Sequence, residues 1–276
     1  MEQISDNEWF EANLNPEIYR AKLGIAIPDL PPDEVQMRFT GRTGRENLQQ
    51  AFDFYKFVLE NLPKLDMSSY TLLDFGGGWG RILRLFLREF QPQRLFMLDA
   101  MKEAVEYARS LNPPFVISQC HVRPPLSMQE GSIGLCYAFS VFSHLAEQEC
   151  SDWLRHFAYL LVPRGKLIIT TRGKSHIDYL ETLDQKNTPY LPASLLPRAE
   201  TIRKVYESSA FQFYPTGGGG ELSQDFYGET WIPKRWLEER YASFGFSSCE
   251  FYPEFKTVDQ CVFVLTKQHA TKQPYS

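Results

Sequence analysis

The sequence lacks the features that mark membrane, secreted and nucleic-acid-binding proteins. Its 276 residues contain no apolar run near the ~18 residues of a membrane span, and the longest candidate, residues 133–142, has the length of a strand. The first residues lack the basic and apolar regions of a signal peptide. The 29 Lys and Arg against 34 Asp and Glu give a net charge of −5, which argues against binding that depends on neutralising nucleic-acid phosphates. We therefore expect a cytoplasmic protein with no nucleic-acid and no membrane partner.

Cysteine is scarce, and its spacing matches no disulfide framework and no zinc site. The five cysteines are an odd number, are widely spread and include no C-x-x-C pair. This favours reduced thiols, and we expect no metal. Glycine and proline, at 17 and 18 residues, are close to average usage, and 43% of the chain is hydrophobic. Such a composition indicates a globular protein.

Two regions differ in character along the chain. In residues 1–70 apolar side chains recur at helical spacing between prolines and a glycine turn, which predicts a helical N-terminal extension or cap. From residue 71 to 276 strands and helices alternate, which predicts one α/β domain. Within it, residues 184–230 are rich in proline and glycine and have no clear period. So long a stretch is typical of a lid-like insertion.

The alternating region predicts seven strands. Five apolar segments, separated by helices or longer connections, indicate a mostly parallel sheet with helices on both faces. The last two strands leave no room for a crossover helix and should pair as an antiparallel hairpin at the edge. The expected strands are 71–75, 94–98, 115–119, 133–139, 166–171, 247–252 and 260–267, and the expected helices are 81–90, 102–110, 150–161 and 233–244.

The strongest local signal is a glycine-rich turn where the first strand meets the following helix. It reads Asp74-Phe75-Gly76-Gly77-Gly78-Trp79-Gly80-Arg81. Glycines allow a tight turn and a close ligand, and the helix start offers free N–H groups. The spacing is D-x-G-x-G-x-G and does not match the G-x-G-x-x-G of dinucleotide sites. A second acid, Asp99, ends the next strand, where it is placed to bind ribose hydroxyls.

These motifs resemble the S-adenosylmethionine site of class I methyltransferases, which have a Rossmann-like fold. The resemblance covers roughly residues 72–267 and includes the segment Ser140–Leu145 and the terminal hairpin. Tracts such as DFGGGWGR and SVFSHL are more specifically similar to a bacterial subgroup that methylates small molecules and glycans. The resemblance implies an enzyme with S-adenosylmethionine as its cofactor and a small molecule or glycan as its substrate.

The resemblance also implies where the cofactor binds. The glycines, including Gly77, would face its methionine part, Asp74 would organise the loop or meet the amino group, and Asp99 would bind the ribose. Ala100 and Met101 would pack on the adenine, and Phe139, at the end of the expected fourth strand, would line the site. Relatives often carry an acid near the end of the third strand, but here the chain reads Gln119-Cys120-His121. The adenine contact would then come from Gln119, His121 or a backbone group.

Three residues on the predicted rim are candidates for catalysis. His144 follows the fourth strand, titrates near neutral pH when unperturbed, and is either a general base or a helix-start residue bonded to backbone. His176 follows the fifth strand and fits a surface loop better than a catalytic role. Arg172 either grips an anionic substrate group or pairs with a carboxylate of the protein.

The sequence alone allows two interpretations of the polar residues after the second glycine run. Asp225, Tyr227 and Glu229 follow the run Gly217–Gly220 and form either a lid over the acceptor or an ordinary loop. Three arginines at helical spacing indicate a solvated helix face; they are Arg81, Arg84 and Arg88.

The family resemblance argues against two kinds of methyltransferase. Metal-dependent catechol-type enzymes carry carboxylates after the fourth strand, where this chain has Ala138-Phe139-Ser140, and the [D/N/S]-P-P-[Y/F] motif of enzymes that methylate nucleic-acid amines is absent there. We expect O-methylation of a small molecule or saccharide, with the N-terminal helices and the insertion closing over the acceptor. The alternatives are N- or carboxyl-methylation, a nicotinamide-dependent oxidoreductase or epimerase, and a non-catalytic protein that binds the cofactor.

Overall fold

The structure, a computed structural model, describes residues 4–183, 195, 198–217, 222–223, 225–255 and 257–269. The chain divides into two compact units, Met1–Val122 and Arg123–Ser276, and each is described by itself. The expected division at residue 70, with a lid-like insertion near 184–230, stays a prediction. Of the run Gly217–Gly220, only Gly217 belongs to the described residues. No helix in the described part of the chain is both long and apolar enough to cross a membrane.

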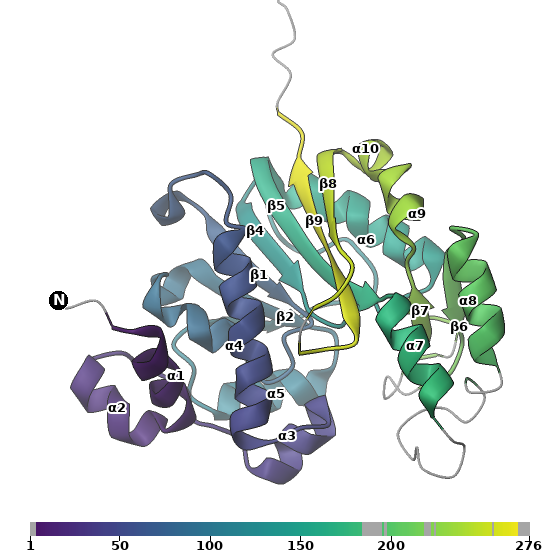
Figure 1. The fold of residues 1–276 in the computed structure, drawn as a ribbon. Coiled ribbons are helices and arrows are strands. Elements are labelled where there is room, and N and C mark those ends of the chain that lie inside the picture. The colour runs from purple at the N-terminus through teal and green to yellow at the C-terminus, as the bar shows by residue number, and fades with distance from the viewer. Residues whose placement is uncertain are drawn as a thin grey trace, which may run out of the picture. The chain divides into compact units, whose positions relative to one another are not determined.

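The first unit begins with the expected helical region. Its helices are α1 (Asp6–Leu14), α2 (Pro16–Leu23), α3 (Asp33–Thr40) and α4 (Gly44–Glu60), drawn in purple and blue in Figure 1. The Ser5 hydroxyl caps α1 by accepting from the Glu8 N–H, at 3.2 Å. One face of α4 is buried, and Ala51, Phe54 and Val58 on it are fully enclosed, as the apolar spacing predicts.

Three parallel strands complete the first unit in the order β3-β2-β1. They are β1 (Thr71–Phe75), β2 (Leu95–Asp99) and β3 (Val116–Gln119), and α5 (Lys102–Ser110) connects β2 to β3. Phe75 lies opposite Leu98, and Asp99 lies opposite Gln119. The strand register therefore brings the glycine-rich turn, Asp99 and the end of β3 to one edge. Short 3₁₀ turns, η1 (Met67–Ser69) and η3 (Pro92–Arg94), precede β1 and β2.

The predicted solvated arginine face is wrong. Residues Leu83–Arg88 form a 3₁₀ helix, η2, instead of the expected α-helix over 81–90. Arg81 and Arg84 are buried and Arg88 is mostly enclosed, because their guanidinium groups bond to the N-terminal helices and loops. Arg84 donates to the carbonyl oxygens of Pro28, Asp29 and Asn13 and to the Asn13 side chain, at 2.7–3.2 Å. Burial lowers the pKa of Arg84 to about 9.

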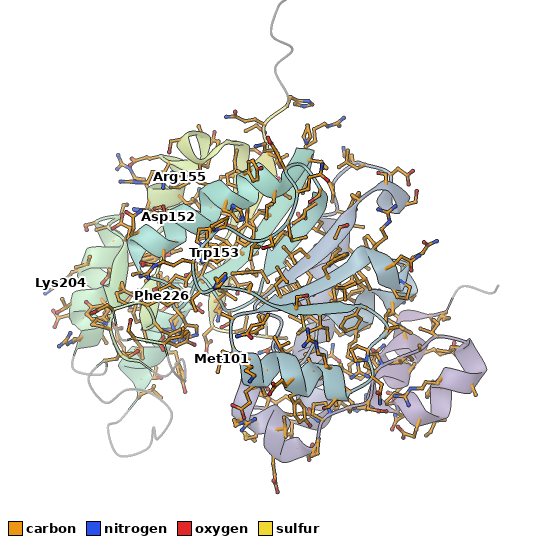
Figure 2. All side chains as sticks on the ribbon, turned by 180° about the vertical axis from the view of Figure 1, so that it is seen from behind. Met101, Asp152, Trp153, Arg155, Lys204 and Phe226 are labelled. Carbon is orange, nitrogen blue, oxygen red and sulfur yellow. The ribbon has the colours of Figure 1, made fainter. Side chains whose placement is uncertain are left out.

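The second unit contains the predicted antiparallel hairpin, which the structure confirms. Strand β4 (Ile133–Ala138) runs parallel to β5 (Leu161–Arg172), and α6 (Glu147–Leu160) connects them. Strand β9 (Gln260–Lys267) lies antiparallel between β5 and β8 (Phe246–Tyr252), as Figure 1 shows in yellow and green. The expected helix at 233–244 is two short helices, α9 (Lys234–Glu238) and α10 (Tyr241–Phe244). On α6, Trp153 is buried, whereas Asp152 and Arg155 reach solvent (Figure 2).

Part of the region without sequence period has regular structure. Helix α7 (Lys174–Thr182) follows β5, and α8 (Ala199–Glu207) precedes two short strands, β6 (Gln212–Tyr214) and β7 (Glu229–Trp231). Strand β7 pairs with β6 and, through Trp231, with the end of β5. An apolar cluster holds these elements together; it contains Ile177, Leu180, Leu195, Ala199, Ile202 and Trp231. The two short strands add to the seven that the sequence predicts.

Candidate functional site

The glycine-rich turn after β1 adopts the backbone that its composition predicts. Gly76, Gly78 and Gly80 have φ angles of 76°, 58° and 82°, in the left-handed region that favours glycine. Gly77 has a different requirement, because a Cβ there would lie 2.4 Å from the Met97 Cγ. Each of the four glycines is therefore needed for the shape of this turn.

Asp99 fastens the turn to the end of β2. Its Oδ2 accepts the Gly78 N–H at 2.9 Å, and its Oδ1 accepts the Met101 N–H at 2.8 Å. Burial raises the pKa of the Asp99 carboxyl, and these two backbone N–H groups oppose the rise. A carboxylate offers about four acceptor positions, so Asp99 can still accept a ligand hydroxyl while it holds the turn.

The other residues predicted at this edge lie close to Asp99. Met101 is 39% exposed, and Figure 2 labels it at the start of α5. The Gln119 side chain donates to the Ala100 carbonyl oxygen at 3.1 Å, and the Cys120 N–H donates to the Asp99 carbonyl oxygen at 2.9 Å. Burial raises the pKa of the Cys120 thiol to about 12, so that it stays neutral.

Two predicted residues of this edge differ in exposure. Asp74 is buried, and its Oδ2 would lie 2.9 Å from a Cβ at Gly77, so it lies directly beneath the turn. His121 is exposed. A turn open to close approach, a buried carboxylate with spare acceptor positions and an exposed apolar side chain fit a nucleoside with an amino-acid tail. These residues of the first unit could hold the predicted cofactor, and their assignment to it stays a prediction.

In the second unit, Arg172 at the end of β5 forms an ion pair with Glu229 at the start of β7. The Arg172 Nε contacts the Glu229 Oε2, and both side chains are mostly buried, at 15% and 10% exposure. The pairing of β5 with β7 brings them together, since Arg172 lies opposite Trp231. Burial raises the pKa of the Glu229 carboxyl, and the positive charge of Arg172 opposes the rise. Arg172 thus has a carboxylate of the protein as its partner.

His144 lies beside this ion pair with its tautomer fixed. Its Nδ1 is 2.8 Å from the Gly228 carbonyl oxygen and 3.8 Å from the Glu229 Oε1. A carbonyl oxygen only accepts, so Nδ1 carries the hydrogen and Nε2 has the lone pair in the neutral ring. Burial and the Arg172 charge lower the pKa of His144 to about 3. His144 is therefore a neutral ring whose Nε2 can accept a proton.

The segment containing Tyr227 and Glu229 is held against the loop of His144 by backbone bonds. The Gly228 N–H donates to the His144 carbonyl oxygen at 3.0 Å, and the Thr230 N–H donates to the Ser143 carbonyl oxygen at 2.9 Å. The Tyr227 ring stacks on the imidazole of His144. A Cβ at Gly228 would lie 2.1 Å from the Tyr214 carbonyl oxygen, so only glycine fits there. The sequence alone does not identify Gly228, because the need for glycine at this position comes from the pairing of β6 with β7.

His176 does not lie in a surface loop, and that expectation is wrong. It belongs to α7, is 3% exposed, and its ring is 5.4 Å from that of Trp231. Burial and the Arg172 charge hold the pKa of His176 well below its usual range. Its Nδ1 has no hydrogen-bond partner among the described residues. Asp225, the remaining residue predicted to contact substrate, is exposed.

A polar network supports the loop after β4, which begins with the half-buried Phe139. Ser140 has a φ of 60°, and its N–H donates to the Thr170 hydroxyl at 2.7 Å. The Gln260 side chain on β9 donates to the Ser140 hydroxyl at 2.8 Å. Gln260 is 120 positions away from Ser140, so no local signal in the sequence could have identified it.

The described residues contain no group of three or more His, Cys, Asp and Glu side chains that could hold a metal ion. All five cysteines are free thiols. The first unit thus holds the predicted cofactor residues apart from Phe139, and the second unit brings His144, Arg172, Tyr227 and Glu229 together.

Comparisons with known proteins show what the fold is similar to. Residues 72–165 match a family model described as a methyltransferase domain. An S-adenosylmethionine-dependent methyltransferase from Mesorhizobium loti is similar over 80% of this chain and 100% of its own, with 12% identity and a TM-score of 0.54. The magnesium protoporphyrin IX methyltransferase of Synechocystis, solved with S-adenosylhomocysteine, is similar over 96% of this chain and 100% of its own, with 11% identity and a TM-score of 0.50.

A third structure is a phosphoethanolamine N-methyltransferase from Haemonchus contortus, with 13% identity and a TM-score of 0.50 over 79% of this chain and 53% of its own. At these identities the structures show a shared fold. A search of curated proteins returned no match.

Proposed function

We propose that this chain, a class I S-adenosylmethionine-dependent methyltransferase, methylates a hydroxyl group of a small molecule or saccharide. The single observation that carries the proposal is the state of His144. Its Nδ1–H is committed to the Gly228 carbonyl oxygen, and its Nε2 has the lone pair. A hydroxyl nucleophile must lose its proton during methyl transfer, and a neutral imidazole in this orientation supplies the acceptor.

In this proposal the cofactor binds at the glycine-rich turn of the first unit. The turn at Gly76–Gly80 takes the methionine part, with Asp74 beneath it, and Asp99 accepts from the ribose hydroxyls. Ala100 and Met101 pack on the adenine, and Gln119, Cys120, His121 and Phe139 are the candidates for its remaining contacts. When bound, S-adenosylmethionine supplies a methyl group on a sulfonium centre that is open to displacement.

In this proposal the second unit supplies the residue that deprotonates the acceptor. His144 accepts the hydroxyl proton at Nε2 while the acceptor oxygen forms its bond to the methyl carbon. Tyr227 keeps the imidazole in position by stacking, and the Arg172–Glu229 ion pair lies beside it. A low pKa makes His144 a weak base, so it acts on a proton that becomes acidic as the bond to carbon forms.

The charges around His144 favour an uncharged acceptor. The charge of Arg172 is balanced by Glu229, and burial keeps His144 and His176 neutral. The Arg172 Nε is already paired with Glu229, so an anionic substrate group would compete with that carboxylate for the charge of Arg172. Asp225 is exposed and is the candidate for contact with a polar, uncharged acceptor such as a sugar.

N- or carboxyl-methylation is the second candidate, because amines and carboxylates need no base. The test is release of S-adenosylhomocysteine from S-adenosylmethionine in the presence of panels of alcohols and saccharides, amines, and carboxylic acids. We expect turnover with a hydroxyl compound that depends on His144. Turnover only with amines or acids would contradict the O-methylation proposal, and binding of S-adenosylmethionine without turnover on any panel would favour a non-catalytic protein.

A further inference from the structure

Phe39 lies against the glycine-rich turn, although it belongs to the N-terminal helix α3. The atoms within 4 Å of a Cβ position on Gly78 are the Cδ1 and Cε1 of Phe39, at 3.5 and 3.9 Å. The Gly78 N–H is the group that donates to Asp99. The Phe39 ring is half-buried, so part of its surface stays open beside the turn.

Two polar connections hold α3 in this place. On one side, Arg38 forms an ion pair of 3.0 Å with Glu103, which lies in the first turn of α5, two residues after Met101. Figure 1 shows α3 and α5 as neighbours in the first unit. The Arg38 guanidinium also lies 5.6 Å from the centre of the Phe39 ring. Helix α3 therefore reaches from the glycine-rich turn to the start of α5.

The second connection runs through buried side chains to the residue after Gly80. The Gln36 Oε1 accepts from the Gly44 N–H at 3.0 Å and from the Asn47 side chain at 2.9 Å. The Asn47 Oδ1 in turn accepts from the Arg81 Nη1 at 2.8 Å. Gln36, Asn47 and Arg81 are all buried. The position of α3 is thereby coupled to the position of the turn.

We propose that Phe39 forms a wall of the S-adenosylmethionine site and contacts the bound cofactor beside Gly78. The inference rests on the proposed placement of the cofactor at the glycine-rich turn. It extends that proposal by assigning a cofactor contact to a helix outside the α/β region, where sequence analysis assigned the N-terminal helices to the acceptor. An aromatic side chain in this place removes water from the bound cofactor and adds apolar contact area.

The test measures S-adenosylhomocysteine binding by isothermal titration calorimetry for the full chain and three variants. Phe39→Ala removes the wall, Phe39→Leu keeps an apolar side chain, and Met37→Ala changes an exposed residue of the same helix. We expect Phe39→Ala to weaken binding ~10-fold or more, Phe39→Leu to recover most of the loss, and Met37→Ala to bind like the wild type. Circular dichroism and the thermal midpoint without ligand check that each variant is folded.

Each result decides for or against the proposal. Unchanged affinity in a folded Phe39→Ala variant would overturn the inference while the cofactor site stands. Tighter binding would overturn it too, because the ring would then occupy the place of the cofactor. Equal losses in Met37→Ala and Phe39→Ala would point to a disturbed helix instead of a lost contact. No binding by folded wild-type protein would remove both this inference and the proposed function.

A second measurement needs no substitution. Hydrogen–deuterium exchange of residues 33–44 should slow when S-adenosylhomocysteine is added, because the ligand adds contacts to α3. Unchanged exchange in α3 together with slower exchange at residues 76–80 would place the ligand at the turn and would contradict a contact with Phe39.

Discussion

The imidazole of His144 lies flat against the ring of Tyr227, with 4.6 Å between ring centres and 7° between the planes. The same imidazole donates from Nδ1 to the Gly228 carbonyl oxygen. Stacking fixes the plane of the ring, and the hydrogen bond fixes its rotation within that plane. Nε2 is thus held in one direction, as a positioned proton acceptor requires.

Replacement of His144 by Ala should lower turnover ~10²–10⁴-fold, because the proposed proton acceptor is lost. The affinity for S-adenosylhomocysteine should stay within twofold, since His144 is not one of the predicted cofactor residues. Steady-state kinetics and calorimetry measure the two quantities. His269→Ala, which removes an exposed histidine away from this loop, is the matched control and should retain most activity. Unchanged turnover in His144→Ala would exclude His144 as the base.

Asp99→Asn should weaken S-adenosylhomocysteine binding ~10-fold or more. The amide loses one of the two oxygens that accept from the Gly78 and Met101 N–H groups, and it accepts ribose hydroxyls less well. Glu106→Gln on the exposed side of α5 makes the same chemical change away from the turn and should have no effect. Equal affinities of wild type and Asp99→Asn by calorimetry would contradict the ribose assignment.

The pH dependence of stability should carry the signature of His144. Its pKa in the folded protein is about 3, below the ~6.5 of an unfolded chain, so the unfolded state binds the extra proton between these values. Stability should therefore fall as the pH drops from 6.5 toward 3, and His176 contributes in the same direction. Urea unfolding at pH 7, 6 and 5 measures this slope. It should be smaller in His144→Gln, and an identical slope would contradict a depressed pKa.

The pH profile of turnover follows from the same lowered pKa of His144. Because His144 stays unprotonated well below pH 6.5, turnover should show no acid limb near that pH. A limb at pH 6–7 that disappears in His144→Gln would show that Arg172 and burial do not lower the pKa of this residue.

Breaking the ion pair between Arg172 and Glu229 should destabilise the protein. Glu229→Leu leaves the Arg172 charge buried without its partner and should cost ~3–5 kcal/mol of unfolding free energy. The double variant Arg172→Met/Glu229→Leu removes both charges and should recover much of that loss. Urea unfolding of the two single variants and the double variant measures the coupling. Additive losses would contradict a direct interaction.

Arg84→Met should cost ~3 kcal/mol or more, because the carbonyl oxygens of Asn13, Pro28 and Asp29 lose their donor. Arg45 is a matched control in the same unit, since its side chain is 60% exposed and pairs with Glu11. Arg45→Met should change stability by ~0.5 kcal/mol at most. Chemical unfolding of both variants gives the comparison, and equal losses would contradict a special role for Arg84.

Much of the fold could be predicted from local patterns. The apolar strands, the glycine-rich turn and Asp99 are encoded by neighbouring residues, and the final hairpin follows from a short connection. Partners that come from distant segments could not be predicted. Arg84 has helical spacing with its neighbours, yet its partners precede it by 55–71 positions. The exposure of His176 was mispredicted for the same reason, because α7 packs against α8 and β7.

In the candidate site, too, local features could be predicted from the sequence and distant partners could not. The sequence predicts Asp99 and the glycines because a backbone requirement is visible in residue type, and it predicts His144 by position after a strand. The partners of Arg172 and His144 depend on the placement of β7, whose three residues carry no strand signal of their own. Phe39 and Gln260 became apparent only when the contacts of Gly78 and Ser140 were known.

The hydrogen bonds of Arg81 and Arg84 bear on any attempt to dissect this protein. A shortened chain that begins at Thr71 would carry every motif of the α/β region, but it would expose two guanidinium groups whose acceptors lie in residues 13–50. The first seventy residues therefore belong to the same folding unit as the glycine-rich turn. A shortened version of this protein has to retain them.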